Sequence, residues 1–223
     1  MTSPATASDL VLMLLADARL PVAGHTQSAG LEPAVADGLR DVPGYIRTRL
    51  HTVTRVDAAS AVVALHRLRQ GMALDEVETA WAARTPSAAM RRTSRGQGKA
   101  LLRLARRLWP DAAVIGTVAS LDAPSRPLVL AACAAVTGLA PRSLARLVGY
   151  DDVQTVGSAA LKLLPLDPAD VACWVYDALP DVEAMADAVA ALLDPHEIPA
   201  AGAPQLEAWA EAHARTTRRL FSA

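Results

Sequence analysis

The stretch PGYIRTRLHTVTRVDAASAVVALHRLRQ, residues 43–70, decides the fold class of this chain. Its apolar side chains recur at spacings built from three and four residues, which places them along one side of an α-helix. Pro43 suits the first turn of a helix, and Gly71 follows the last periodic residue. The stretch therefore predicts one long amphipathic helix from Pro43 to about Gln70. Its apolar stripe consists of Ile46, Leu50, Val53, Ala61, Leu65 and Leu68.

One carboxylate, Asp57, falls on this apolar stripe. Burying a carboxylate costs free energy unless the group is paired or hydrogen-bonded. We expect Asp57 to be a satisfied structural residue, and a functional role for it is the open alternative.

The rest of the chain also favours helices. Its 223 residues contain only three Ile, three Tyr and one Phe, whereas alanine and leucine, which favour helices, dominate. We expect an all-α, single-domain bundle of about ten helices over residues 9–194. A flexible N-terminus (1–8) precedes it, and a linker (195–204) and a helical docking tail (205–223) follow. The predicted helices cover about 9–19, 28–38, 43–70, 74–83, 86–109, 112–121, 125–138, 141–164, 168–179, 181–193 and 205–221.

The helix after Pro86 has two distinct faces. Small residues at Ser94 and Gly98 share one face with leucines and alanine, and they predict close approach by another helix, since glycine inside a helix otherwise costs about 1 kcal/mol. The other face is basic. A net charge of −1 and the lack of interleaved aromatics argue against nucleic-acid binding. A solvated face and docking to an acidic protein surface remain open. The basic stripe consists of Arg92, Arg95, Lys99, Arg103 and Arg106.

No catalytic constellation is visible. The segment from Gly96 to Lys99 resembles the end of a phosphate-binding loop, but Thr93 replaces its first glycine and Ala100 its Ser or Thr. The histidines stand without a second ligand at compact spacing. We therefore expect a protein that is not an enzyme and has no catalytic residue, metal site or tightly bound cofactor. The five histidines are His25, His51, His66, His196 and His213.

The chain carries no sign of export or membrane insertion. The apolar run from Leu10 to Ala16 is not preceded by Lys or Arg, as a signal peptide would be. The longest stretch without Asp, Glu, Lys or Arg runs from Pro127 to Pro141, which is too short to span a bilayer. Two isolated cysteines fit a reducing compartment. We expect a cytoplasmic protein.

Four blocks of sequence, taken in order, carry a family resemblance. Residues 15–32 read LADARLPVAGHTQSAGLE, and residues 91–102 contain the spacing R-x-x-S-x-x-x-G-x-x-L-L. A third block joins Arg146 and Tyr150 to residues 162–166, KLLPL, and the fourth runs from His213 to residues 219–221, RLF. Together they resemble the UreF family of urease accessory proteins, whose N-terminal signature is approximately L-P-x-G-G-[FY]-[ST]-[HY]-S-x-G-L-E. The residues that match family motifs are Pro21, Gly24, Ser28, Gly30, Leu31, Glu32, Ser94, Gly98, Lys162 and Pro165.

The residue types in the first block, residues 15–32, suit a turn followed by a helix. Pro21 and Gly24 suit a turn, and Ser28 can cap the helix that begins near Gly30. His25 and Gln27 depart from the family pattern, which has an aromatic residue at the first position and Tyr or His at the second.

The resemblance implies an all-α homodimer that bridges the UreD/UreH scaffold protein and the GTPase UreG during insertion of nickel into apo-urease. Nickel would pass through the complex, and GTP would belong to the partner. It further implies that Arg146 and Tyr150 recruit the GTPase. The residues that would contact the scaffold protein are His25, Arg219, Leu220 and Phe221. The alternatives from the residues alone are a helical ligand-binding transcriptional regulator that touches DNA through the basic stripe, and a small helical enzyme using Asp57 and a histidine.

Overall fold

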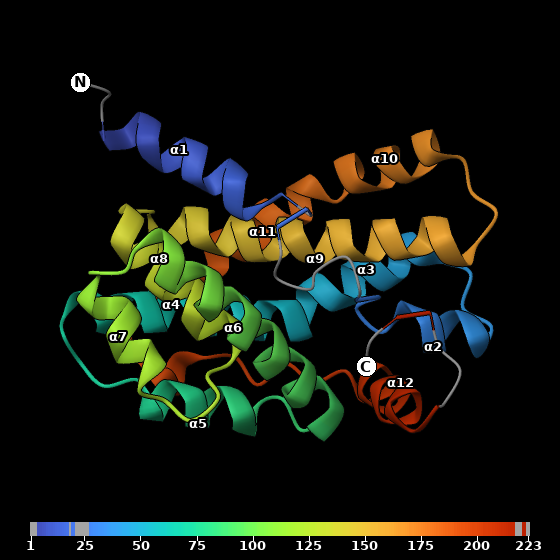
Figure 1. Ribbon diagram of the computed structural model, residues 1–223. Helices are drawn as coiled ribbons and strands as arrows, with labels where there is room; N and C mark the ends of the chain where they lie inside the picture. Colours follow the sequence, from blue (N-terminus) through green and yellow to red (C-terminus); the bar gives the residue numbers. More distant parts are fainter. Residues whose placement is uncertain (1–3, 18, 21–26, 217–219, 222–223) are drawn as a thin grey trace.

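The computed structural model describes residues 4–17, 19–20, 27–216 and 220–221 (Figure 1). The all-α class is confirmed: the described part of the chain holds α-helices and one short 3-10 helix, and no strand. The helices are α1 Pro4–Leu15, α2 Leu31–Ala36, α3 Val42–His51, α4 Val53–Arg69, α5 Asp75–Ala83, α6 Ala88–Leu108, α7 Ala113–Ala119, α8 Arg126–Thr137, α9 Pro141–Leu163, α10 Pro168–Asp177, α11 Leu179–Val189, the 3-10 helix η2 Pro195–Glu197, and α12 Pro204–Arg215.

The core forms where α4 packs against α8 and α9 (Figure 1). Alanines make this close packing possible, because their short side chains let helix backbones approach. Ala58, Ala61 and Ala64 of α4 are fully buried, as are further alanines of α8 and α9. Larger side chains, among them Leu65 and Trp81, fill the space between the helices. No helix in the described residues is both long and apolar enough to cross a membrane.

The single long helix predicted from Pro43 to Gln70 is wrong in one respect, because it is broken at Thr52. Helix α3 ends at His51 and α4 begins at Val53, with Thr52 between them at φ −122° and ψ −102°. Its hydroxyl donates to the carbonyl oxygen of Thr48 at 2.6 Å. Three successive β-branched residues, Thr52 to Thr54, weaken helix propensity here, and α4 starts on a new angular phase.

The N-terminal helix begins earlier and ends earlier than predicted. Residues 4–8, expected to be flexible, belong to α1, which stops at Leu15 instead of Arg19. Asp17 stops the helix, since its carboxylate accepts hydrogen bonds from the backbone and side chain of Arg19 at 2.9 to 3.2 Å. Helix α1 lies over α8 and α9, on the side of the bundle opposite α5 and α12 (Figure 1).

Residues 195–204, expected to be a linker, pack against the bundle. Asp194 and Glu197 form a capping box around η2. Ile198 is 2% exposed, and its carbonyl oxygen accepts from Nε of Arg84 at 2.6 Å. The final helix α12 is shorter than the predicted 205–221, because the backbone becomes extended at Thr216. It lies beside α2 and α6.

Candidate functional site

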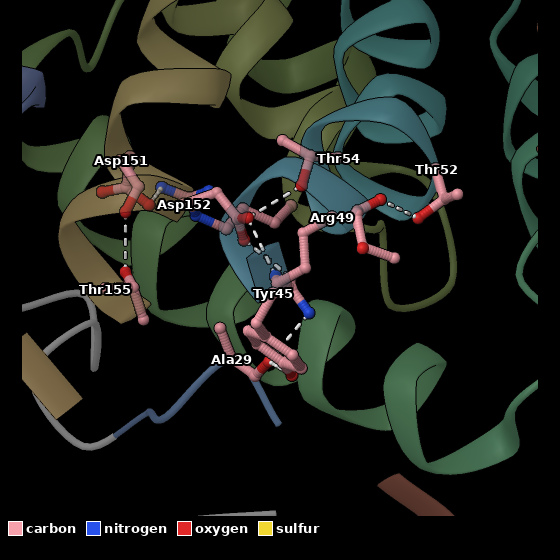
Figure 2. A network of polar contacts seen from close by, with 10 residues as sticks. Ala29, Tyr45, Arg49, Thr52, Thr54, Asp151, Asp152 and Thr155 are labelled. Carbon is pink, nitrogen blue, oxygen red and sulfur yellow. Dashed lines mark hydrogen bonds and ion pairs between the residues drawn. The ribbon is translucent and has the colours of Figure 1, made fainter. Parts of the chain in front are cut away.

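A charged network joins α3, α4 and α9 beside the loop before α2 (Figure 2). Arg49 donates through Nε and Nη2 to the carboxylate of Asp152 at 2.9 and 2.6 Å. Thr54 donates to the same carboxylate at 2.8 Å. On the other side, the Tyr45 hydroxyl and Nη1 of Arg49 each donate to the carbonyl oxygen of Ala29 at 2.7 Å.

The break at Thr52 is what allows this convergence. Residues five apart on a continuous α-helix point about 140° away from each other. Arg49 and Thr54 are five apart, yet both reach Asp152 because α4 starts on a new angular phase. Asp152 therefore fixes the angle between two consecutive helices.

Two more carboxylates line the same pocket, which has a volume of about 140 Å³. Asp151 accepts from Nη2 of Arg126 at 3.0 Å. Asp57 accepts from Nε1 of Trp81 at 2.7 Å, so the hydrogen bond expected for this aspartate is confirmed. A functional role for Asp57 stays open.

Burial dominates the electrostatics of this pocket. It raises the pKa of Asp57 from its ordinary value near 3.8 to about 6, against the opposing hydrogen bond from Trp81. Burial likewise raises the pKa of Tyr45 to about 12. Burial alone would lower the pKa of Arg49. The pKa is nevertheless raised, because the Asp152 carboxylate stabilises the guanidinium cation. The charged groups Arg49, Asp152, Arg126 and Asp151 thus hold one another, which suits a rigid support.

The residues expected to recruit a GTPase, Arg146 and Tyr150, lie one turn apart on α9. Arg146 pairs with Glu183 of α11 at 2.8 Å, and its side chain is 39% exposed. The Tyr150 hydroxyl accepts from Nε2 of Gln154 at 2.9 Å. Both residues line an open groove of about 550 Å³ between α1, α9 and α11, which also includes Leu12. Their contact with a partner stays a prediction.

Residues 220–221 are held in a cluster that we call the tail clasp, which consists of Glu32, Lys162, His213, Leu220 and Phe221. Glu32 accepts from the backbone N–H groups of Leu220 and Phe221 at 2.7 and 3.1 Å, and His213 Nε2 lies 3.6 Å from its carboxylate. Nζ of Lys162 sits 5.0 Å from the centre of the Phe221 ring. Phe221 is 4% exposed and Leu220 73%. Here Phe221 docks on its own chain, and its contact with a scaffold partner stays a prediction.

The predicted capping role of Ser28 is wrong. Helix α2 begins at Leu31 with Gly30 as its N-cap, and Ser28 contributes only its backbone carbonyl, which accepts from the N–H of Leu31 at 2.9 Å. Gly30 adopts φ +78°, and a Cβ there would lie 2.9 Å from the Tyr45 hydroxyl. The turn therefore needs glycine at this position. Four predicted residues lie outside the described part of the chain: Pro21, Gly24, His25 and Arg219.

The close approach by another helix predicted at Ser94 and Gly98 is present, and that helix is α8. The backbone from Pro124 to Arg126, where α8 begins, packs against Gly98. A Cβ at Gly98 would overlap the carbonyl oxygen of Pro124 and come within 3.1 Å of the backbone nitrogen of Arg126. The hydroxyl of Ser94 accepts from that nitrogen at 3.2 Å. Pro165 follows α9 in the turn that leads to α10.

Sequence reasoning missed the paired charges of the pocket. Arg49 and Asp152 are separated by 103 residues, so no local spacing connects them. The available signal was weak, because Asp151 and Asp152 are adjacent acids on a helix that also carries Arg142, Arg146 and Lys162. Within the described residues, no group of three His, Cys, Asp or Glu side chains is placed to hold a metal ion.

Comparison with known proteins gives one consistent result. The model of the UreF family matches residues 38–179 of this chain. A urease accessory protein UreF from Mycobacterium sp. (strain JLS) is 38% identical over 217 residues, which cover 95% of this chain and 97% of the relative. Proteins of the same name from Mycolicibacterium vanbaalenii and Mycobacterium tuberculosis (strain H37Rv) are 36% and 35% identical, with the same shares covered.

Proposed function

Because this chain belongs to the UreF family of urease accessory proteins, we propose that it bridges the UreD/UreH scaffold protein and the GTPase UreG while nickel is inserted into apo-urease. It acts as a cytoplasmic homodimer without catalysis of its own. GTP is bound by the partner, and nickel passes through the assembled complex.

One observation carries the bridging role: the two predicted docking surfaces are held apart on the same rigid helix. Arg146 and Lys162 both belong to α9, and sixteen residues of α-helix span about 24 Å. Arg146 lines the groove beside α1, whereas Lys162 packs on Phe221 in the tail clasp. Two partners can therefore bind at the same time without competing for space.

The tail clasp suggests how the scaffold surface is built. Phe221 is buried on its own chain and fixes the end of the tail. Leu220 beside it is 73% exposed, so it is the apolar side chain that a partner can bury. In this proposal Phe221 positions the tail and Leu220 contacts the scaffold protein.

Exposed apolar side chains that a partner can bury also support the homodimer. Large apolar side chains stay exposed on α1 and α10, which lie on the same side of the bundle (Figure 1). Leu10 is 62% exposed and Tyr176 73%. Burying such side chains against a second copy stabilises an assembly at roughly 25 cal/mol per Å². A Leu10→Glu, Tyr176→Glu variant should elute as a monomer in light scattering, and an unchanged dimer would remove this surface from the proposal.

The bridging role is tested in cells that carry the urease genes and their accessory genes, with this chain as the sole UreF. Arg146→Ala, Tyr150→Ala should lose co-purification of UreG and retain UreD/UreH. Leu220→Asp should do the reverse. Both should lower urease activity and bound nickel about tenfold or more. Arg142→Ala is the matched control, since Arg142 lies one turn away, is 40% exposed and also pairs with Glu183.

Circular dichroism confirms that each variant remains helical before its partners are compared. Loss of both partners from both variants would contradict two separate surfaces. Nickel-loaded, active urease in cells without this chain would contradict the function altogether.

A further inference from the structure

Helix α6 carries basic side chains along one face and has no acidic residue to balance them. Its 21 residues include seven Arg or Lys and no acidic residue, in a chain of net charge −1. At 100° per residue, the side chains at 92, 95, 99, 103 and 106 fall within an arc of about 80°. The opposite face is buried, with Ser94, Gly98, Leu101 and Ala105 packed inward. The stripe therefore faces solvent as one strip of cations.

The two halves of this stripe differ in how the chain itself neutralises them. In the first half, Arg95 pairs with Glu78 of α5 at 3.3 Å, and Arg92 interacts with Glu211 of α12. In the second half, Lys99, Arg103 and Arg106 are exposed, and none has an ion pair or hydrogen bond within the described residues. Three cations over about 10 Å of helix are thus left without acids of their own.

This arrangement works against the stability of the helix. Like charges four residues apart, as at Arg95 and Lys99 or Lys99 and Arg103, destabilise a helix by roughly 0.2 to 0.5 kcal/mol per pair. A solvated face would mix acids and bases instead. The clustering is therefore better explained by a ligand that supplies the missing negative charge.

An apolar groove adjoins the free end of the stripe. It has a volume of about 550 Å³, is bordered by Arg106 and Pro110, and is floored by Ile115 and Ala119 of α7. A cationic strip beside an apolar groove matches an amphipathic helix that carries carboxylates on one flank and an apolar side chain on the next.

We propose that Lys99, Arg103 and Arg106, with the groove beside them, bind an acidic amphipathic helix of a partner protein. Carboxylates spaced at i, i+4 and i+7 on that helix would meet the three cations. The stripe carries no aromatic side chain to stack on bases, and its free part is much shorter than a duplex site, so nucleic acid fits less well. This surface is separate from α9 and from the tail clasp, and does not depend on the proposed function.

The test uses the full chain and a labelled 15-residue helical peptide with Glu at i, i+4 and i+7 and Leu on the adjoining flank. Fluorescence anisotropy at low salt should show binding that weakens at 150 mM salt. Arg103→Glu should weaken binding about tenfold, which corresponds to about 1.4 kcal/mol. Arg47→Glu, an equal change of charge at an exposed position of α3, should leave binding unchanged.

A second variant tests whether the clustered cations bind a partner or only keep this face of the helix solvated. Lys99→Gln, Arg103→Gln should resist urea slightly better than the parent and bind the peptide more weakly. Higher stability with unchanged affinity would overturn the proposal. So would equal binding of a peptide with the same residues spread around its helix, equal weakening by Arg47→Glu, or tighter binding of a 15-base-pair duplex than of the peptide.

Discussion

Replacing Asp57 with asparagine should stabilise the protein at neutral pH, although it removes a buried group that is well hydrogen-bonded. Asparagine keeps an oxygen that accepts from Nε1 of Trp81, as Asp57 does at 2.7 Å. It removes the charge that burial disfavours. Because the pKa of Asp57 rises from its ordinary value near 3.8 to about 6 on folding, ionising it costs folding free energy. The difference corresponds to about 3 kcal/mol above pH 6.

The pH dependence gives the sign of the effect. A carboxyl group whose pKa is raised on folding binds its proton more tightly in the folded than in the unfolded chain. The free-energy penalty from Asp57 therefore grows as pH rises from about 4 to 6 and is constant above that. Asp57→Asn should be more stable than the parent by about 3 kcal/mol at pH 7.5 and by only about 1 kcal/mol at pH 4.5.

Urea unfolding followed by circular dichroism at the two pH values measures this difference. Asp152→Asn is the matched control in the same pocket, because its carboxylate is paired with Arg49 and hydrogen-bonded by Thr54. It should destabilise the protein by about 3 kcal/mol, since it leaves a buried guanidinium without its counter-ion. An Asp57→Asn protein that is no more stable than the parent at pH 7.5, or whose stability advantage grows on acidification, would show that burial does not raise the pKa of Asp57.

Three further outcomes follow from the packing. Gly98→Ala should destabilise the protein by about 2 kcal/mol or more in urea, because a methyl group would overlap the Pro124 carbonyl; an unchanged midpoint would contradict the close approach. Glu32→Ala should release the tail, so that carboxypeptidase removes residues through Phe221 at least fivefold faster by mass spectrometry, whereas equal trimming would show that the clasp does not hold. Asp167→Ala should lower the melting temperature by a few degrees, since it removes an N-cap hydrogen bond of 2.8 Å worth about 1 kcal/mol.

Local patterns in the sequence predicted most of the fold. The helix starts at Pro141 and Pro168 were correct, because proline in the first turn and an N-cap aspartate act within a few residues. The break at Thr52 could not be predicted from the apolar stripe, since Leu50 and Val53 fit a continuous helix as well as an interrupted one. What holds the break is Asp152, about one hundred residues further along the chain.

The site was less predictable than the fold, for the same physical reason. Asp57 could be recognised because a charge on an apolar stripe is costly, and its hydrogen bond then followed. Nothing near Arg49 identifies Asp152 as its partner. For Phe221, the sequence shows only an apolar residue near a chain end, which suits docking on a partner or on its own bundle; the choice depends on Glu32, 189 residues away.

The tail clasp has a practical consequence for anyone who attaches a purification tag or a fluorescent protein to this chain. A fusion after Ala223 would be separated by only two residues from Phe221, whose ring is buried and whose backbone N–H donates to Glu32. The added polypeptide would pull on that attachment and crowd Leu220. Tags at the other terminus leave the clasp untouched and are the better choice for measurements of scaffold binding.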